Sequence, residues 1–184
     1  MRKIGLISVA LMLFTGLASA QIPTSGNVYF GYSYYNADLS SLGGRSSFNG
    51  WTASGEGKVL PFIGIVADIG QTYGSEHVPI LCPAPACPSV SISAHELNVL
   101  FGPRASVSVG KIRPFAEVLF GVGHISTNSG GASDTSFATA IGGGIDYKII
   151  RPVAWRLEGD YVQTRFFGST QDNVRLTTGL VLRF

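Results

Sequence analysis

The sequence has little charge. Asp, Glu, Lys and Arg make up 13% of its 184 residues, about half the usual share. Its 9 prolines and 24 glycines stay below the share typical of low-complexity chains, and a hydrophobic content of 45% excludes a disordered one. The length allows one domain. The composition therefore indicates a folded chain with too few charges for an ordinary water-facing exterior.

A mostly apolar run near the N-terminus follows a basic start. It extends from Ile4 to Leu17, and Ala18-Ser19-Ala20 supplies the small residues of a signal-peptidase site. Because the run is shorter than the roughly 20 residues of a spanning helix, we expect a cleavable signal peptide over 1–20 rather than a permanent anchor, and a mature domain over 21–184. Cleavage leaves 11 basic and 11 acidic residues, so we expect no binding of nucleic acid.

Only two cysteines are present, Cys82 and Cys87, in a proline-rich stretch. An exported chain meets an oxidising compartment, so we expect a disulfide that closes the tip of a loop. The alternative is a metal site with His77 and His95 as additional ligands, but four prolines and a single cysteine pair fit zinc-ligand spacings poorly. We therefore expect neither a metal nor a cofactor.

Alternation with a period of two residues recurs along the mature chain, and no stretch has a sustained helical period. This pattern predicts eight strands: Asn27 to Asn36, Gly50 to Leu60, Phe62 to Gly74, Ile92 to Val107, Arg113 to Ser126, Thr135 to Lys148, Pro152 to Phe166, and Asn173 to Phe184. The connections alternate between long and short. An even number of strands with this alternation is typical of an all-β, antiparallel, up-and-down transmembrane β-barrel.

The two phases of the alternation differ in bulk and charge. One phase carries large apolar and aromatic side chains such as Phe30, Trp51 and Phe120. The other mixes small residues with charged ones: Glu56, Lys58, Asp68, Glu96, Arg104, Glu117, Asp146, Arg156, Glu158, Asp160, Arg175 and Arg183. An eight-stranded barrel has room inside for side chains only, and a charge at the lipid midplane costs about 2 to 4 kcal/mol. We therefore expect the bulky phase to face lipid and the charges to form an ion-pair network in the lumen, rather than a soluble barrel with an apolar interior.

With these features the sequence resembles small outer-membrane β-barrels of the outer-membrane-protein-A-like and opacity-like type. The stretches that carry the resemblance, besides the signal sequence and the eight strands, are Arg113 to Val118, Gly121 to Gly123, Trp155 to Tyr161 and Val181 to Phe184. The resemblance implies a place in the cell outer membrane, in contact with its lipids. It also implies that Leu180, Leu182 and Phe184 form the signal by which the barrel insertion machinery recognises the chain. We expect a monomer.

Two groups of residues suggest catalysis. The first, His124 and Ser126 with Asp134 as a possible orienter, is similar to the His-x-Ser-Asn motif of lipid A deacylases, although Thr127 separates Ser126 from the asparagine.

The second group consists of Glu117, Glu158 and Asp160, carboxylates that suggest a glycosidase-like acid and base. Arginines share their phase, which favours a structural network instead.

We therefore expect a protein that is not an enzyme. Its expected role is structural, in envelope integrity, or in surface adhesion or recognition, with an unknown surface ligand bound by the loops 37–49, 74–91, 127–134 and 168–172. A narrow ion or small-solute channel is the alternative, and a lipid-modifying hydrolase is a further one. Eight strands are too few for a general diffusion porin.

Overall fold

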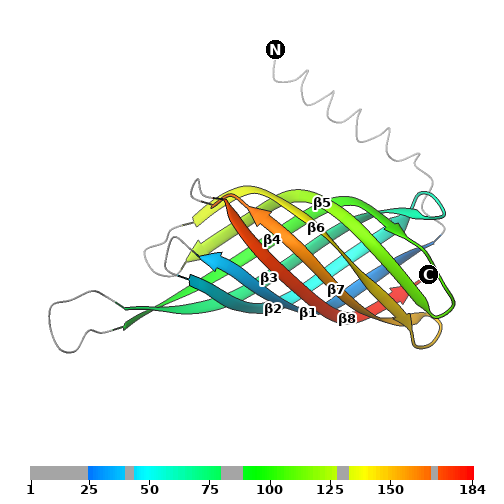
Figure 1. Cartoon of the computed structure of the whole chain (residues 1–184), viewed down its shortest axis with the longest axis horizontal. Helices are drawn as coiled ribbons and strands as arrows, with labels where there is room; N and C mark the ends of the chain where they lie inside the picture. Colours follow the sequence, from blue (N-terminus) through cyan, green and yellow to red (C-terminus); the bar gives the residue numbers. More distant parts are fainter. Residues whose placement is uncertain (1–24, 40–43, 80–88, 128–132, 167–169) are drawn as a thin grey trace, which may run out of the picture.

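The computed structural model describes residues 25–39, 44–79, 89–127, 133–166 and 170–184. These residues form a closed barrel in which every strand pairs antiparallel with its neighbours in sequence, and β1 also pairs with β8 (Figure 1). The strands are β1 (Gly26–Leu39), β2 (Gly44–Lys58), β3 (Ile63–Pro79), β4 (Ser89–Ser106), β5 (Ile112–Thr127), β6 (Ser133–Lys148), β7 (Val153–Thr164) and β8 (Gln171–Arg183). No helix in these ranges is long and apolar enough to cross a membrane.

All eight predicted strands are present, and the predicted fold class is confirmed. Two hairpins are longer than predicted: β2 begins at Gly44 and not at Gly50, and the hairpin of β3 and β4 continues to the pair Pro79 and Ser89 and extends beyond the other strands (Figure 1). Strand ends were predicted from apolar alternation, whereas backbone pairing continues without it. The expected signal peptide, Cys82 and Cys87 lie outside the described residues.

The connections of β2 to β3, β4 to β5 and β6 to β7, of four, five and four residues, lie at one end of the barrel (Figure 1). Those at the other end have four, nine, five and six residues, so the predicted alternation of long and short connections holds for β3 to β4 and fails for β1 to β2, whose strands pair almost to the tip of the hairpin. The turn between β4 and β5 contains Gly110 with φ of 62°, a backbone conformation that favours glycine. At the same end the pairing of β1 with β8 is completed by two hydrogen bonds. The Gly26 N–H donates to the carbonyl of Phe184 at 2.9 Å, and the Phe184 N–H donates to that of Gly26 at 3.1 Å. We call this the turn end and the opposite one the loop end.

The bulky phase of the alternation points outward. Phe30 is 63% exposed, and Phe137 and Ile141 are similarly open. An exterior that exposes so many large apolar side chains is suited to lipid and not to water. Inward positions also include an apolar layer that the sequence did not predict: Tyr35, Phe48, Val66, Leu100, Leu119, Ala138, Ala140 and Val162.

Inward glycines allow neighbouring strands to approach closely. A Cβ added at Gly121 would lie 2.0 Å from the carbonyl oxygen of Val99 on the paired strand, and one at Gly102 would lie 2.1 Å from that of Val118. An added Cβ at Gly55, in contrast, would meet no atom within 4 Å. Gly102 and Gly121 are therefore required by packing of β4 against β5.

Candidate functional site

Arg104 is the centre of the first of three charged clusters in the lumen. It lies on β4 directly opposite Glu117 of β5, and the two side chains approach to 2.5 Å. Its guanidinium also contacts Glu56 at 3.4 Å and Glu158 at 3.3 Å. One arginine thus connects carboxylates from β2, β5 and β7.

Asp146 on β6 is the centre of the second cluster. Its cross-strand partners are Arg113 on β5 and Arg156 on β7, with N to O distances of 3.7 and 2.6 Å. Arg183 contacts the same carboxylate at 3.0 Å. Arg113 also pairs with Glu56, which connects this cluster to the first.

Arg175 on β8 is the centre of the third cluster. It contacts its cross-strand partner Asp160 at 2.9 Å and reaches across the lumen to Asp68 on β3 at 2.7 Å. Glu158 lies 3.9 Å from Arg175 and 3.6 Å from Arg156, so it connects all three clusters. The result is a single network of five arginines and six carboxylates: Arg104, Arg113, Arg156, Arg175, Arg183, Glu56, Asp68, Glu117, Asp146, Glu158 and Asp160.

Aromatic rings fill the space between the guanidinium groups. The Phe115 ring centroid lies 4.3 Å from the guanidinium carbon of Arg104 and 4.6 Å from that of Arg156. Arg156 also lies 4.9 Å from the ring of Tyr29. These are cation–π distances. Because every side chain of the network except Arg183 is at most 5% exposed, water has almost no access to the charges.

The structure places ten of the twelve predicted lumen charges in the network. Glu96 is buried but forms no ion pair among the described residues. It accepts hydrogen bonds from the hydroxyl of Tyr35 at 3.1 Å and the amide of Asn98 at 2.9 Å. Lys58 is half-buried at the turn end and is likewise without an ion pair in the described chain. Sequence reasoning missed Arg113, although it shares the inward phase of Glu117.

The candidate hydrolase residues are not assembled as a triad. His124 is exposed, and its Nδ1 lies 2.7 Å from the hydroxyl oxygen of Thr135. Within the described strands no hydrogen bond joins His124 to Ser126. Asp134 shares the inward phase of Ala138, opposite to that of His124, and accepts a hydrogen bond from the Thr135 N–H at 2.8 Å. A histidine base and its orienting carboxylate would have to lie side by side.

The candidate glycosidase carboxylates do lie close together. Glu117, Glu158 and Asp160 each place an oxygen within 4.8 Å of the others. Each is at most 3% exposed, and Arg104 and Arg175 pair with them. A sugar ring has no access to such a site.

The remaining predicted residues lie on the exterior. Leu180, Leu182 and Phe184 share the outward phase and are 53%, 53% and 72% exposed. His95, offered as a metal ligand, packs edge-on against Tyr73, with ring centroids 5.2 Å apart.

No protein-family model matches the chain, and no curated protein matches it significantly. Solved structures do. Neisserial surface protein A aligns with a TM-score of 0.67 at 12% identity over 86% of this chain and 97% of its own. Ail, the attachment invasion locus protein of Yersinia pestis, in complex with the heparin analogue sucrose octasulfate, aligns with a TM-score of 0.59 at 13% identity over 87% and 98%. OprG from Pseudomonas aeruginosa aligns with a TM-score of 0.56 at 9% identity over 89% and 97%.

The fold is that of a small outer-membrane β-barrel. The resemblance stated from the sequence is therefore confirmed at the level of architecture, and at these identities the likeness concerns the fold alone. The apolar exterior gives an independent argument, because a closed barrel with such a surface needs lipid around it. Fold and exterior together indicate a protein of the bacterial outer membrane.

Proposed function

We propose that this protein is a closed, non-conducting outer-membrane barrel that acts through its outer surface, in envelope structure or in recognition by its loops, and not through its lumen. The observation that carries the proposal is the network itself. Arg175 alone joins β8 to β3 and β7, so its side chain crosses the space that an ion would have to use. Eight strands enclose only enough room for such side chains.

The apolar layer adds a second barrier beyond the charges. Leu100 lies on the loop side of Arg104 along β4, and Val162 lies on the loop side of Asp160 along β7. Both apolar side chains are at most 1% exposed. An ion that passed the network would then lose its water against this layer, which is how hydrophobic constrictions block conduction.

A closed lumen leaves the loops as the means of contact with the surroundings. Segments 40–43, 80–88, 128–132 and 167–169 connect the strands at the loop end and lie outside the described residues. Ail, a barrel of the same fold, is named as an attachment protein, which supports a role in attachment here. Membrane anchoring by a rigid barrel with exchangeable loops is a general strategy for recognition.

Conductance of the refolded mature chain in planar bilayers tests the closed lumen. We expect no discrete steps from the native sequence. Two leucine variants form a matched pair. Leu119→Gly opens the apolar layer, whereas Leu157→Gly removes an outward leucine, and we expect any leak of ions only in Leu119→Gly. Steps from the native chain would show a channel and contradict the proposal.

Loop replacement tests the surface role. Each of the four loop segments is exchanged for a short Gly-Ser linker, and adhesion of cells and their sensitivity to detergent are measured together with the amount of folded barrel. We expect at least one exchange to reduce one of these properties at an unchanged barrel amount. If neither property changes in any exchange, or on removal of the whole protein, the proposed role is wrong.

A further inference from the structure

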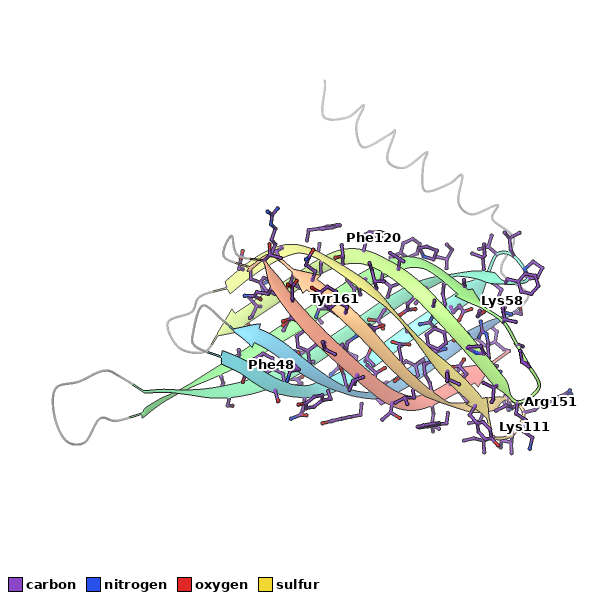
Figure 2. The ribbon with its side chains drawn as sticks, viewed as in Figure 1. Phe48, Lys58, Lys111, Phe120, Arg151 and Tyr161 are labelled. Atoms are coloured by element: carbon purple, nitrogen blue, oxygen red, sulfur yellow. The ribbon has the colours of Figure 1, made fainter. Side chains whose placement is uncertain are left out.

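Four basic side chains lie at the turn end of the barrel: Lys111 and Arg151 are exposed on the turns, and Lys58 and Lys148 are half-buried at the rim, two residues after the lumen carboxylates Glu56 and Asp146. Lys58, Lys111 and Arg151 are seen at this end in Figure 2. None of the four forms an ion pair with a described carboxylate. The nearest acidic residues in sequence, Glu56 and Asp146, are buried and already paired with lumen arginines. The turn end therefore presents uncompensated positive charge.

The same turns expose large apolar side chains. The exposed residues next to the basic ones are Val59, Leu60, Phe62, Val107, Val109, Ile149 and Ile150, each 49 to 65% exposed. Turns that face water favour Gly, Pro, Asn, Asp and Ser instead. These side chains continue the apolar exterior of the barrel through Ile63 and Ile112. The tips of the turns thus have the composition of a membrane interface, with apolar side chains beside long basic ones.

Charge is distributed unequally between the two ends. All three lysines after residue 21 are at the turn end. The segments at the loop end carry Asp38, Glu76, Asp134 and Asp172 against Arg45 and Arg165. Since the mature chain is formally neutral, the positive turn end is balanced by the loop end and the lumen.

We propose that the turn end binds the headgroups of anionic phospholipids in the adjacent leaflet. Lysine and arginine side chains would pair with phosphate groups, while the apolar tips lie among the upper acyl carbons. The arrangement around the barrel favours lipid over a protein partner. Lys111, Lys148 and Arg151 lie on two neighbouring turns, where the Lys148 N–H donates to the carbonyl of Lys111 at 2.8 Å. Exposed apolar side chains, however, are repeated on all three turns, which join β2 to β3, β4 to β5 and β6 to β7, and they continue the lipid-facing exterior around the rim. Lipid surrounds a barrel in the same way.

Trp155 is a reporter for this region. It lies on the outward phase near the start of β7, opposite Tyr147, whereas Trp51 lies at the middle of β2. A Trp51→Phe chain has Trp155 as its only tryptophan and keeps an aromatic ring against Phe30. This chain is refolded into phosphatidylcholine vesicles that contain either acyl-brominated phosphatidylglycerol or acyl-brominated phosphatidylcholine. The ratio of quenching by the two brominated lipids gives their relative affinity for the shell around Trp155.

We expect phosphatidylglycerol to be favoured, by about five-fold for each basic side chain that contacts a headgroup, and the preference to fall in high salt. Replacement of the four basic residues by glutamine should bring the ratio close to one, and Lys111→Gln and Arg151→Gln, both at exposed positions, should each reduce it. The matched control is Arg165→Gln at the loop end, which should leave it unchanged.

Equal quenching by the two lipids in the Trp51→Phe chain would overturn the proposal. So would a preference that survives in the glutamine variants, because the basic residues would then not be its cause. An equal loss in Arg165→Gln would show that the effect does not belong to the turn end.

Discussion

Replacement of Arg104 by methionine tests whether the lumen is as dry as its burial indicates. Arg104 contacts three carboxylates. Glu56 keeps Arg113 and Glu158 keeps Arg156 when Arg104 is removed, but Glu117 forms no other ion pair among the described residues. Removal of one partner of a buried pair costs about 3 to 5 kcal/mol, because the other charge is left uncompensated. We expect Arg104→Met to lower the free energy of unfolding by this amount.

The measurement is equilibrium unfolding by urea of the barrel refolded in lipid vesicles, followed by tryptophan fluorescence. A double variant, Arg104→Met with Glu117→Gln, removes both charges of the closest pair. Since the orphaned carboxylate is then gone, we expect the double variant to recover about 1 to 3 kcal/mol relative to additivity. Arg165→Met, at an exposed position outside the lumen, is the matched control and should change stability by no more than about 0.5 kcal/mol.

Two results would refute this reasoning. A loss below about 1 kcal/mol for Arg104→Met is the value of a solvent-exposed ion pair, and it would show that water reaches the network. Additive losses in the double variant would show that Arg104 acts by packing against Phe115 and not by compensating Glu117. Either result would also weaken the proposal of a closed lumen.

Three further predictions concern packing, insertion and the cysteines. Gly121→Ala, which drives a Cβ into the backbone of the facing strand, should destabilise the barrel by about 1 to 3 kcal/mol, whereas Gly55→Ala, with open space around it, should have an effect within about 0.5 kcal/mol; urea unfolding distinguishes them. Phe184→Ala should reduce the amount of barrel assembled in cells but not its refolding into vesicles in vitro, and equal losses in both assays would contradict a role as an insertion signal. Alkylation of the denatured, unreduced protein should modify neither Cys82 nor Cys87, and both should react after reduction.

The sequence predicts the barrel well because lipid imposes a strict pattern on its exterior. Each strand must place apolar side chains outward at every second position, as Phe30 and Ile141 do, and this period is visible without any knowledge of strand pairing. The apolar layer of the lumen was not predicted, because prediction depended on this alternation. Leu100 and Leu119 have apolar neighbours on both sides, so the alternation that separates the two faces is lost there.

Which charged residues belong to the network depends on how the strands are placed relative to one another, and no single strand shows this. Which inward residues reach the same level is set by the tilt and stagger of the strands around the barrel. Glu96 has the phase of Arg104 but lies farther toward the loop end, where Tyr35 and Asn98 are its partners. Arg113 lies at the level of Asp146 because β5 and β6 pair in that register. The sequence shows which residues point into the lumen, but it does not show at which height along the barrel axis each of them lies.

The pairing of β1 with β8 has a consequence for how the protein is made. These two strands are the first and the last of the eight, and each supplies the other with ten paired positions, from Asn27 with Arg183 to Asn36 with Val174. Until β8 is in place, β1 has an unpaired edge that can pair with other chains and lead to aggregation. The barrel therefore cannot close before β8 is present, and the edge of β1 that pairs with β8 is the one edge that no neighbour in sequence can protect.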